Sequence, residues 1–310
     1  MRRVLFALNA AEGLAGRLAS LLDCELGTVE RRQFPDGESY IRLSTPVANR
    51  HVLVLCSLDC PDTKALPLLF VADAARQQGA ESVGLIAPYL AYMRQDKAFS
   101  PGEAVTSRTF AGLIDSQFDW LVTVDPHLHR YPNLGALYSR PALATSAAEP
   151  VADWIRTNVE RPVVIGPDEE SAQWVERIAT LIDVPWRVFR KERRGDFDVS
   201  LSAAVVDLAE EATPVLVDDI ASSARTMIEA VRTLRNAGRR APYCVVVHAI
   251  FAGDAFEQLQ LMEPAGVAST NAVAHETNLI DISGPLAAAV KEMLAGWRAT
   301  VDLSAERKRE

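Results

Sequence analysis

The sequence predicts an α/β protein with two tandem domains, each a mostly parallel sheet flanked by helices. Short apolar runs rich in Val, Ile and Leu alternate with helical patterns along almost the whole chain. Such runs are typical of parallel strands that are buried on both faces. The 310 residues are also enough for two domains of ordinary size, each with its own core.

The expected elements begin with a strand in "VLFAL" (4–8) and its helix in "AGRLASLL" (15–22). A second strand, "HVLVLCSL" (51–58), precedes a helix that ends at Gly79. In that helix the spacing of Leu66, Leu69, Phe70 and Asp73 predicts one apolar face. Further strands are expected in 82–90, 119–127, 161–169, 213–220 and 243–251.

Residues 131–150 mark a domain boundary, because Pro, Gly and Ala replace the periodic pattern there. We therefore expect domains over 1–143 and 144–290, followed by a C-terminal helix and charged tail over 291–310. The halves echo each other weakly, since 119–129 and 213–223 are both strands that end in acidic and polar residues.

The composition restricts the partners. A formal net charge of −9 argues against nucleic acid or an anionic membrane, although a local basic cluster can still hold an anionic small molecule. No apolar run approaches the roughly 20 residues of a membrane helix, and Glu12 and Arg17 interrupt the start that could pass for a signal peptide. Four cysteines without metal-site spacing predict buried reduced thiols and a cytoplasmic location: Cys24, Cys56, Cys60 and Cys244.

The stretch "VLVDDIASSARTM" (215–227) carries the first candidate site. Asp218 and Asp219 follow an apolar run, and helical spacing resumes at Thr226 and continues to a stop at Gly238. Ligands of open α/β sheets bind at such strand-to-helix junctions, and a helix start suits phosphate. The hydroxyls of this loop add donors, whereas the two acids suit a ribose diol or a metal. The alternative is that the acids only cap the helix.

This stretch resembles the phosphoribosyl diphosphate signature of type I phosphoribosyltransferases, which is two acids followed by a phosphate cradle. The matching ribose 5-phosphate positions are Asp218, Asp219, Ser222, Ser223, Ala224, Arg225 and Thr226. Arg225 departs from the glycine of that pattern. It either blocks close backbone approach or adds a guanidinium to the phosphate.

Five further motifs extend the resemblance over roughly residues 1–290. They are "QFPDGESYIR" (33–42), "PYLAYMRQDK" (88–97), "TVDPHLHR" (123–130), "IGPDEESAQW" (165–174) and "RKERRGDFDVSLS" (190–202). In this order they resemble the ribose-phosphate diphosphokinase family. The resemblance implies two type I phosphoribosyltransferase-like domains, with ATP on the N-terminal side and ribose 5-phosphate on the C-terminal side. It also implies diphosphoryl transfer between these substrates with release of AMP, and a homo-oligomer, either a dimer or a hexamer.

The same resemblance implies roles for single residues. The ATP-binding positions would be Phe34, Asp36, Gly37, Glu38, Arg94, Gln95 and His127. Mg²⁺ would be associated with His127 and Asp168, and the cationic Lys191 and Arg193 would be catalytic. Read alone, His127 and His129 could instead form part of a transition-metal site, and the basic run 190–194 could be a solvated face.

Two other functions remain open from the residues. A phosphoribosyltransferase would share the signature but would not need the motifs in 33–130. A non-catalytic regulatory homologue is the second alternative, because Arg225 and the pair Glu169–Glu170 depart from the family pattern. No residue stands out as a general base.

Overall fold

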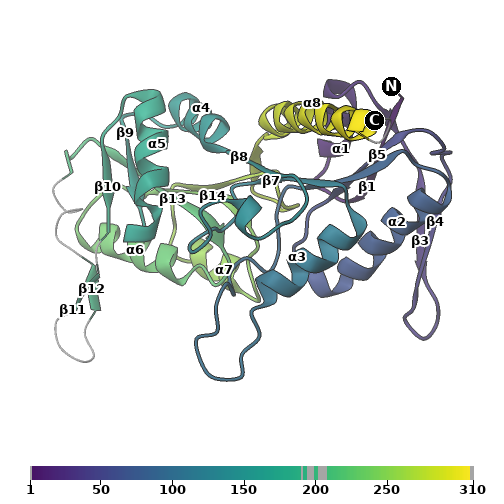
Figure 1. Cartoon of the computed structure of the whole chain (residues 1–310). Coiled ribbons are helices and arrows are strands. Elements are labelled where there is room, and N and C mark those ends of the chain that lie inside the picture. The colour runs from purple at the N-terminus through teal and green to yellow at the C-terminus, as the bar shows by residue number, and fades with distance from the viewer. Residues whose placement is uncertain (1, 190, 194–198, 202–207, 308–310) are drawn as a thin grey trace. The chain divides into compact units, whose positions relative to one another are not determined.

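The computed structural model describes residues 2–189, 191–193, 199–201 and 208–307 and divides into two compact units (Figure 1). Unit 1 contains residues 1–146 and 283–310, and unit 2 contains residues 147–282. The expected boundary at 143/144 lies three residues before this division. Residues 283–290, expected in the second domain, group with unit 1 because the helix they begin packs on elements of that unit.

Unit 1 is built on a six-stranded sheet whose neighbouring strands are all parallel. In spatial order the strands are β2 (Glu25–Leu26), β1 (Arg3–Asn9), β5 (His51–Cys56), β6 (Ser82–Ala87), β7 (Trp120–Val124) and β8 (Ala142–Thr145). Its helices are α1 (Leu14–Leu21), α2 (Ala65–Gln77), α3 (Thr106–Gln117) and α8 (Ser283–Arg307), with short 3-10 turns η1 (Pro61–Thr63) and η2 (Leu134–Ala136). Helices α1 and α8 cover one face of the sheet, and α2 and α3 cover the other (Figure 1).

A separate antiparallel hairpin projects from unit 1. It consists of β3 (Val29–Gln33) and β4 (Ser39–Leu43), and β4 packs on α2.

Unit 2 repeats the parallel architecture. Its sheet order is β10 (Trp186–Val188), β9 (Pro162–Gly166), β13 (Thr213–Ala221), β14 (Tyr243–Ala249), β15 (Gly266–Thr270) and β16 (Asn278–Ile280). The helices are α4 (Ala148–Asn158), α5 (Ala172–Ile182), α6 (Arg225–Asn236) and α7 (Ala255–Gln260), with the 3-10 turn η3 (Glu169–Ser171). Helices α4 and α5 pack together, as do α6 and α7 on the opposite face (Figure 1). A two-stranded antiparallel pair, β11 (Lys191–Arg193) and β12 (Val199–Leu201), completes the unit.

The predicted α/β class with two parallel sheets is confirmed. The reason lies in the long apolar runs: β5, β6 and β7 are buried along their whole length, as strands covered by helices on both faces must be. Close packing between β6 and β7 also requires one glycine. Gly84 lies opposite Trp120, and a Cβ at Gly84 would be 2.0 Å from the indole ring.

The predicted face of α2 is wrong. Leu66 and Phe70 are 58% and 43% exposed, whereas the residues that face the sheet are Pro67, Leu68, Val71, Ala72 and Ala75. This helix is apolar on two sides, so its periodicity alone does not determine which side is buried.

The four cysteines form no disulfide. Burial raises the pKa of Cys56 to about 12 and that of Cys24 to about 11, as expected for inert thiols. Cys60 is exposed and Cys24 is half-buried, which corrects the expectation that all four are buried. Among the described residues, no helix is long and apolar enough to cross a membrane.

Candidate functional site

Carboxylates gather at the carboxyl ends of two neighbouring strands in unit 2. Asp168 follows β9 and begins η3, where its Oδ1 accepts the backbone N–H of Glu170 at 3.1 Å and of Ser171 at 3.2 Å. These two bonds fix the carboxyl group in place. Because β9 pairs with β13, Asp168 lies beside the acids of β13.

Asp218 and Asp219 lie inside β13, which continues to Ala221 rather than ending before them. Asp218 is half-buried, and its Oδ1 accepts the backbone N–H of Asp219 at 3.0 Å. Desolvation raises the pKa of Asp218 well above its ordinary value, and the negative charges of Asp219 and Asp168 raise it further. The structure therefore brings three acids together that are far apart in sequence.

The two adjacent acids do not cap the following helix. Helix α6 begins at Arg225, and its N-cap residue is Ala224, which makes no side-chain capping bond, whereas both acids lie inside β13. The capping alternative for Asp218 and Asp219 is therefore wrong, and their position needs another explanation.

The loop between β13 and α6 has a backbone shaped by one unusual residue. Ala224 has φ +52°, in the left-handed region that disfavours residues with a Cβ. That conformation explains why a glycine suits this position. Ser222 and Ser223 precede it, and the carbonyl of Ser222 accepts the N–H of Ala252 at 3.0 Å, which ties the loop to the end of β14.

Arg225 occupies the first position of α6 and is exposed, and Thr226 follows it, half-buried. The first turn of α6 contains no acidic residue. The positive end of the helix dipole and the Arg225 guanidinium thus coincide, an arrangement that is unfavourable for the isolated helix and favourable for a bound anion. An exposed arginine at the helix start does not fill the backbone cradle.

The acids fit a hard divalent cation by their chemistry. Mg²⁺ takes oxygen ligands and is often held by one or two carboxylates, with substrate phosphates and water completing the shell. Burial raises the pKa of Asp218 most, and such a cation would relieve the further part that comes from repulsion by Asp219 and Asp168. Among the described residues, no three His, Cys, Asp or Glu side chains are arranged to hold a metal by themselves.

The turn of the β3–β4 hairpin carries the predicted adenine-side residues of unit 1. The N–H of Phe34 donates to the carbonyl of Glu38 at 2.8 Å, and the N–H of Gly37 donates to that of Phe34 at 2.9 Å. Asp36 accepts the N–H of Glu38 at 3.2 Å, and Gly37 has φ +93°, which favours glycine. The Phe34 ring is 41% exposed, so it is accessible to a planar ligand.

The other predicted ATP residues of unit 1 follow β6 and β7. The carbonyl of Gln95 accepts the N–H of Ser107, and its side-chain oxygen accepts the Thr106 hydroxyl at 3.4 Å. An ion pair at 3.2 Å between Asp96 and Arg130 joins this segment to the one after β7.

In that second segment the rings of His127 and His129 meet edge to face at a centroid separation of 3.8 Å. Arg94 and His127 therefore lie in linked segments at one edge of the sheet.

Two expectations are not tested by these contacts. Lys191 and Arg193 form β11, which pairs with β12, but their side chains and the neighbouring Arg190 and Arg194 lie outside the described residues. The two residues proposed for magnesium, His127 and Asp168, belong to different units.

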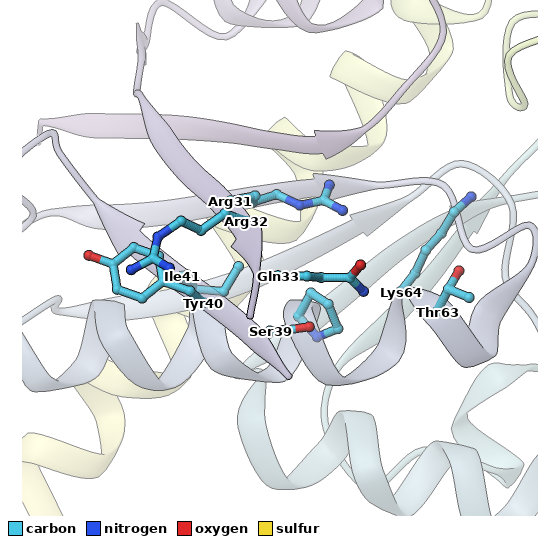
Figure 2. A pocket seen from close by; sticks show the side chains of 9 residues that line it. Arg31, Arg32, Gln33, Ser39, Tyr40, Ile41, Thr63 and Lys64 are labelled. Carbon is cyan, nitrogen blue, oxygen red and sulfur yellow. The ribbon is translucent and has the colours of Figure 1, made fainter. Parts of the chain in front are cut away.

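Sequence reasoning missed a cavity of 410 Å³ in unit 1, between the hairpin and the start of α2 (Figure 2). Arg31 and Lys64 border it. The adjacent arginines in "ERR" (30–32) were the sequence feature that could have indicated a basic cavity. Nothing in the sequence, however, shows that this run lies near Lys64.

Comparison with known proteins gives matches along almost the whole chain. A family model of the N-terminal domain of ribose phosphate pyrophosphokinase matches residues 3–117, and one of the phosphoribosyl transferase domain matches residues 133–261. The ribose-phosphate pyrophosphokinase of Methanopyrus kandleri is 35% identical over 294 residues, covering 93% of this chain and 99% of that protein. The one from Saccharolobus solfataricus is 29% identical, covering 87% and 93%.

Among solved structures, phosphoribosylpyrophosphate synthetase from Mycobacterium smegmatis shares the fold, with a TM-score of 0.82 at 24% identity. The match covers 96% of this chain and 100% of the synthetase chain. The two parallel sheets and the acids beside the α6 cradle agree with the family models and the full-length relatives. The chain therefore belongs to the ribose-phosphate pyrophosphokinase family.

Proposed function

We propose that this protein makes 5-phosphoribosyl 1-diphosphate from ATP and ribose 5-phosphate and releases AMP. The observation that carries the proposal is the cluster of Asp168, Asp218 and Asp219 beside an anion-compatible helix start in unit 2. Full-length relatives named as ribose-phosphate pyrophosphokinases support it.

In this proposal the sugar phosphate binds in unit 2. Asp218 and Asp219 accept hydrogen bonds from the ribose hydroxyls, and the loop 222–226 holds the 5-phosphate at the N-terminus of α6. Arg225 adds a flexible cation at the rim of the loop. Asp168, Asp218 and Asp219 would hold Mg²⁺, and the bound cation would neutralise phosphate charge.

ATP would meet the residues of unit 1. The exposed Phe34 ring provides a surface for the adenine, and Asp36, Gly37 and Glu38 shape its turn. Arg94, Gln95 and His127 would orient the triphosphate. Lys191 and Arg193 would neutralise the transferring group.

The reaction itself needs little covalent chemistry from the protein. The C1 hydroxyl oxygen of the sugar forms a bond to the β-phosphorus of ATP while the bond from that phosphorus to the α-phosphate oxygen breaks. AMP leaves, and the hydroxyl proton passes to solvent. Positioning of the two substrates in line and neutralisation of negative charge supply the acceleration.

The test is incubation of the protein with ATP, Mg²⁺ and ribose 5-phosphate, with the nucleotide products separated. AMP that appears only when the sugar phosphate is present supports the proposal. ADP, or no product, contradicts it. Phosphoribosyl diphosphate supplied with a nucleobase tests the phosphoribosyltransferase alternative, and tight substrate binding without turnover would favour the regulatory homologue.

The proposal extends to assembly and location. A homo-oligomer, either dimer or hexamer, follows from the resemblance to the family, and sedimentation equilibrium measures it. A reducing, cytoplasmic location agrees with four cysteines that form no disulfide.

A further inference from the structure

The cavity of unit 1 lies between one face of the β3–β4 hairpin and the segment that enters α2 (Figure 2). Its volume of 410 Å³ is within the range of about 300–1,000 Å³ that small-molecule pockets occupy. The residues that line it are Arg31, Arg32, Gln33, Ser39, Tyr40, Ile41, Thr63, Lys64 and Pro67. None of these described lining residues carries a carboxylate.

The hairpin register separates the two adjacent arginines. Arg31 pairs with Ile41 and Arg32 pairs with Tyr40, so the two guanidinium groups leave opposite faces of the hairpin. Figure 2 shows Arg31 and Gln33 extending toward the side of Lys64, while Arg32 turns back over Tyr40. The Arg32 guanidinium lies 4.0 Å from the centroid of the Tyr40 ring. Only Arg31 therefore directs its charge toward Lys64.

Arg31 is held in this direction by unit 1 itself. Its Nη1 donates to the carbonyl of Leu8 at the end of β1. That bond uses one of the five N–H donors of the guanidinium. The remaining donors keep the planar fork that matches the oxygens of a phosphate.

Lys64 is fixed on the opposite wall. Its Nζ lies 2.7 Å from Asp59 Oδ1 and 3.3 Å from the carbonyl of Ser57, and its side chain is only 14% exposed. Asn9 also donates to Asp59 at 3.2 Å. Asp59 offsets the charge of Lys64, so the charge of Arg31 remains for an incoming anion, and the polar side chains of Gln33 and Ser39 also line the cavity.

From this arrangement we infer that the cavity binds the phosphate group of a small molecule. A guanidinium and an ammonium held on facing walls make the charge-assisted hydrogen bonds that phosphate oxygens accept. The site belongs to unit 1, whereas the proposed sugar-phosphate cradle belongs to unit 2. None of the residues proposed to bind ATP lines the cavity either, so the inference goes beyond the proposed function.

The experiment is a titration of the full-length protein followed by backbone amide NMR, first with inorganic phosphate and then with glycerol 3-phosphate. The amide signals of Gln33, Ser39 and Thr63 should shift in a saturable manner. Binding to the cradle of unit 2 would instead shift Ser223 and Thr226, which separates the two sites. Tighter binding of the ester would identify an organic phosphate as the ligand, and equal binding would identify free phosphate.

Matched variants test which charges matter. Arg31→Gln and Lys64→Gln should each weaken binding about tenfold, as loss of one charge-assisted contact predicts. Arg42→Gln removes the same charge from an exposed position of the same hairpin that does not line the cavity, and it should change binding less than about twofold. The double variant Asp59→Asn/Lys64→Gln removes the ion pair of these two residues without leaving an unpaired carboxylate. It too should bind phosphate weakly.

Two results would overturn the inference. One is the absence of shifts at Gln33, Ser39 and Thr63 with both probes. The other is an equal loss of binding in Arg31→Gln and Arg42→Gln, which would mean general attraction by charge instead of a site. Neither depends on whether the protein forms AMP.

Discussion

Asp168 lies beside Asp218, although Asp168 follows β9, Asp218 lies inside β13, and β10, β11 and β12 separate the two in the chain. The pairing of β9 with β13 brings them together at one edge of the sheet of unit 2. Burial raises the pKa of Asp218, and the negative charges of Asp219 and Asp168 raise it further. Negative groups held this close store repulsion in the folded protein. A cation or hydroxyl-rich ligand at this edge would relieve it.

The first prediction concerns stability and pH. An acid whose pKa is higher in the folded protein than in the unfolded chain binds its proton more tightly when folded. Stability therefore falls as the pH rises from about 4, the ordinary pKa of aspartate, through the raised pKa of Asp218, and stays reduced above it. Asp218→Asn removes this loss, so its free energy of unfolding in urea should exceed that of the wild type at pH 7 and change less with pH.

Magnesium provides a second measurement of the same effect. Mg²⁺ should raise the melting temperature of the wild type more than that of Asp218→Asn, because the variant lacks one of the repelling charges. Glu210→Gln, an exposed acid of unit 2, serves as the control and should behave like the wild type. A variant with the same pH profile as the wild type would show that neither burial nor the neighbouring acids raise the pKa of Asp218 appreciably.

The second prediction concerns the left-handed Ala224. Glycine relieves a strain of about 1–2 kcal/mol at such a position but costs about 0.5–1 kcal/mol of chain entropy. Ala224→Gly should therefore leave stability unchanged or raise it by up to about 1.5 kcal/mol. Ala224→Val should lose about 1–3 kcal/mol and weaken ribose 5-phosphate binding, since a branched residue moves the cradle out of this conformation.

Ala237→Val is the matched control for Ala224→Val, because Ala237 ends the same helix with φ −80°. It should retain sugar-phosphate affinity. Isothermal titration with ribose 5-phosphate measures all three variants. Equal affinity in Ala224→Val and Ala237→Val would remove the cradle from the proposed binding site.

The third prediction decides the role of Arg225. An exposed guanidinium at the start of α6 can reach an anion at the cradle without occupying it. Arg225→Gln should therefore raise the Michaelis constant for ribose 5-phosphate about tenfold while turnover changes little. A lower Michaelis constant would mean that the arginine obstructs the phosphate, and an unchanged one would mean that it points to solvent.

Much of the scaffold is predictable from the sequence because its strands are buried on both faces. Few alternatives to a buried strand exist for the apolar runs of β5, β6, β7, β9, β13 and β14. The β3–β4 hairpin was not predicted, since "VERRQ" is polar and largely exposed, and neither it nor the mostly half-buried "SYIRL" has the alternation of a half-buried strand. Its stability comes instead from β4 packing on α2.

The candidate site was predicted as separate motifs and not as an arrangement. Asp168 and Asp218 were both singled out, but their proximity depends on the sheet order β10-β9-β13, which local patterns do not contain. The expected strand over 213–220 already contained Asp218 and Asp219, although aspartate is disfavoured in strands. Pairing with β14 overrides that preference.

The fourth prediction tests the packing of unit 1. A Cβ at Gly84 would lie 2.0 Å from the Trp120 ring, and Trp120 is fully buried, so neither residue can move aside. Gly84→Ala should lower the free energy of unfolding by about 3 kcal/mol or more. Gly16→Ala, inside α1 with no atom near its Cβ, should instead raise it by about 0.5–1 kcal/mol. Equal stability of the two variants would contradict this account.

The last prediction concerns Lys191 and Arg193, which stand in a run of cations within an otherwise acidic chain. If they meet the transferring group only as its charge redistributes, their binding energy appears in the transition state and not in the ground state. Lys191→Ala and Arg193→Ala should each reduce turnover by about 10²–10³, the scale of losing one preorganised donor. The Michaelis constants for both substrates should move far less, and the melting temperature should stay near that of the wild type.

Arg187→Ala is the matched control, because Arg187 is an exposed arginine on the strand just before this run. Its turnover should equal that of the wild type. Wild-type turnover in the Lys191→Ala/Arg193→Ala double variant would exclude both residues from the reaction. The charge of the transferring group would then have to be neutralised by Arg94 and magnesium, and Arg94→Ala would become the variant that loses turnover.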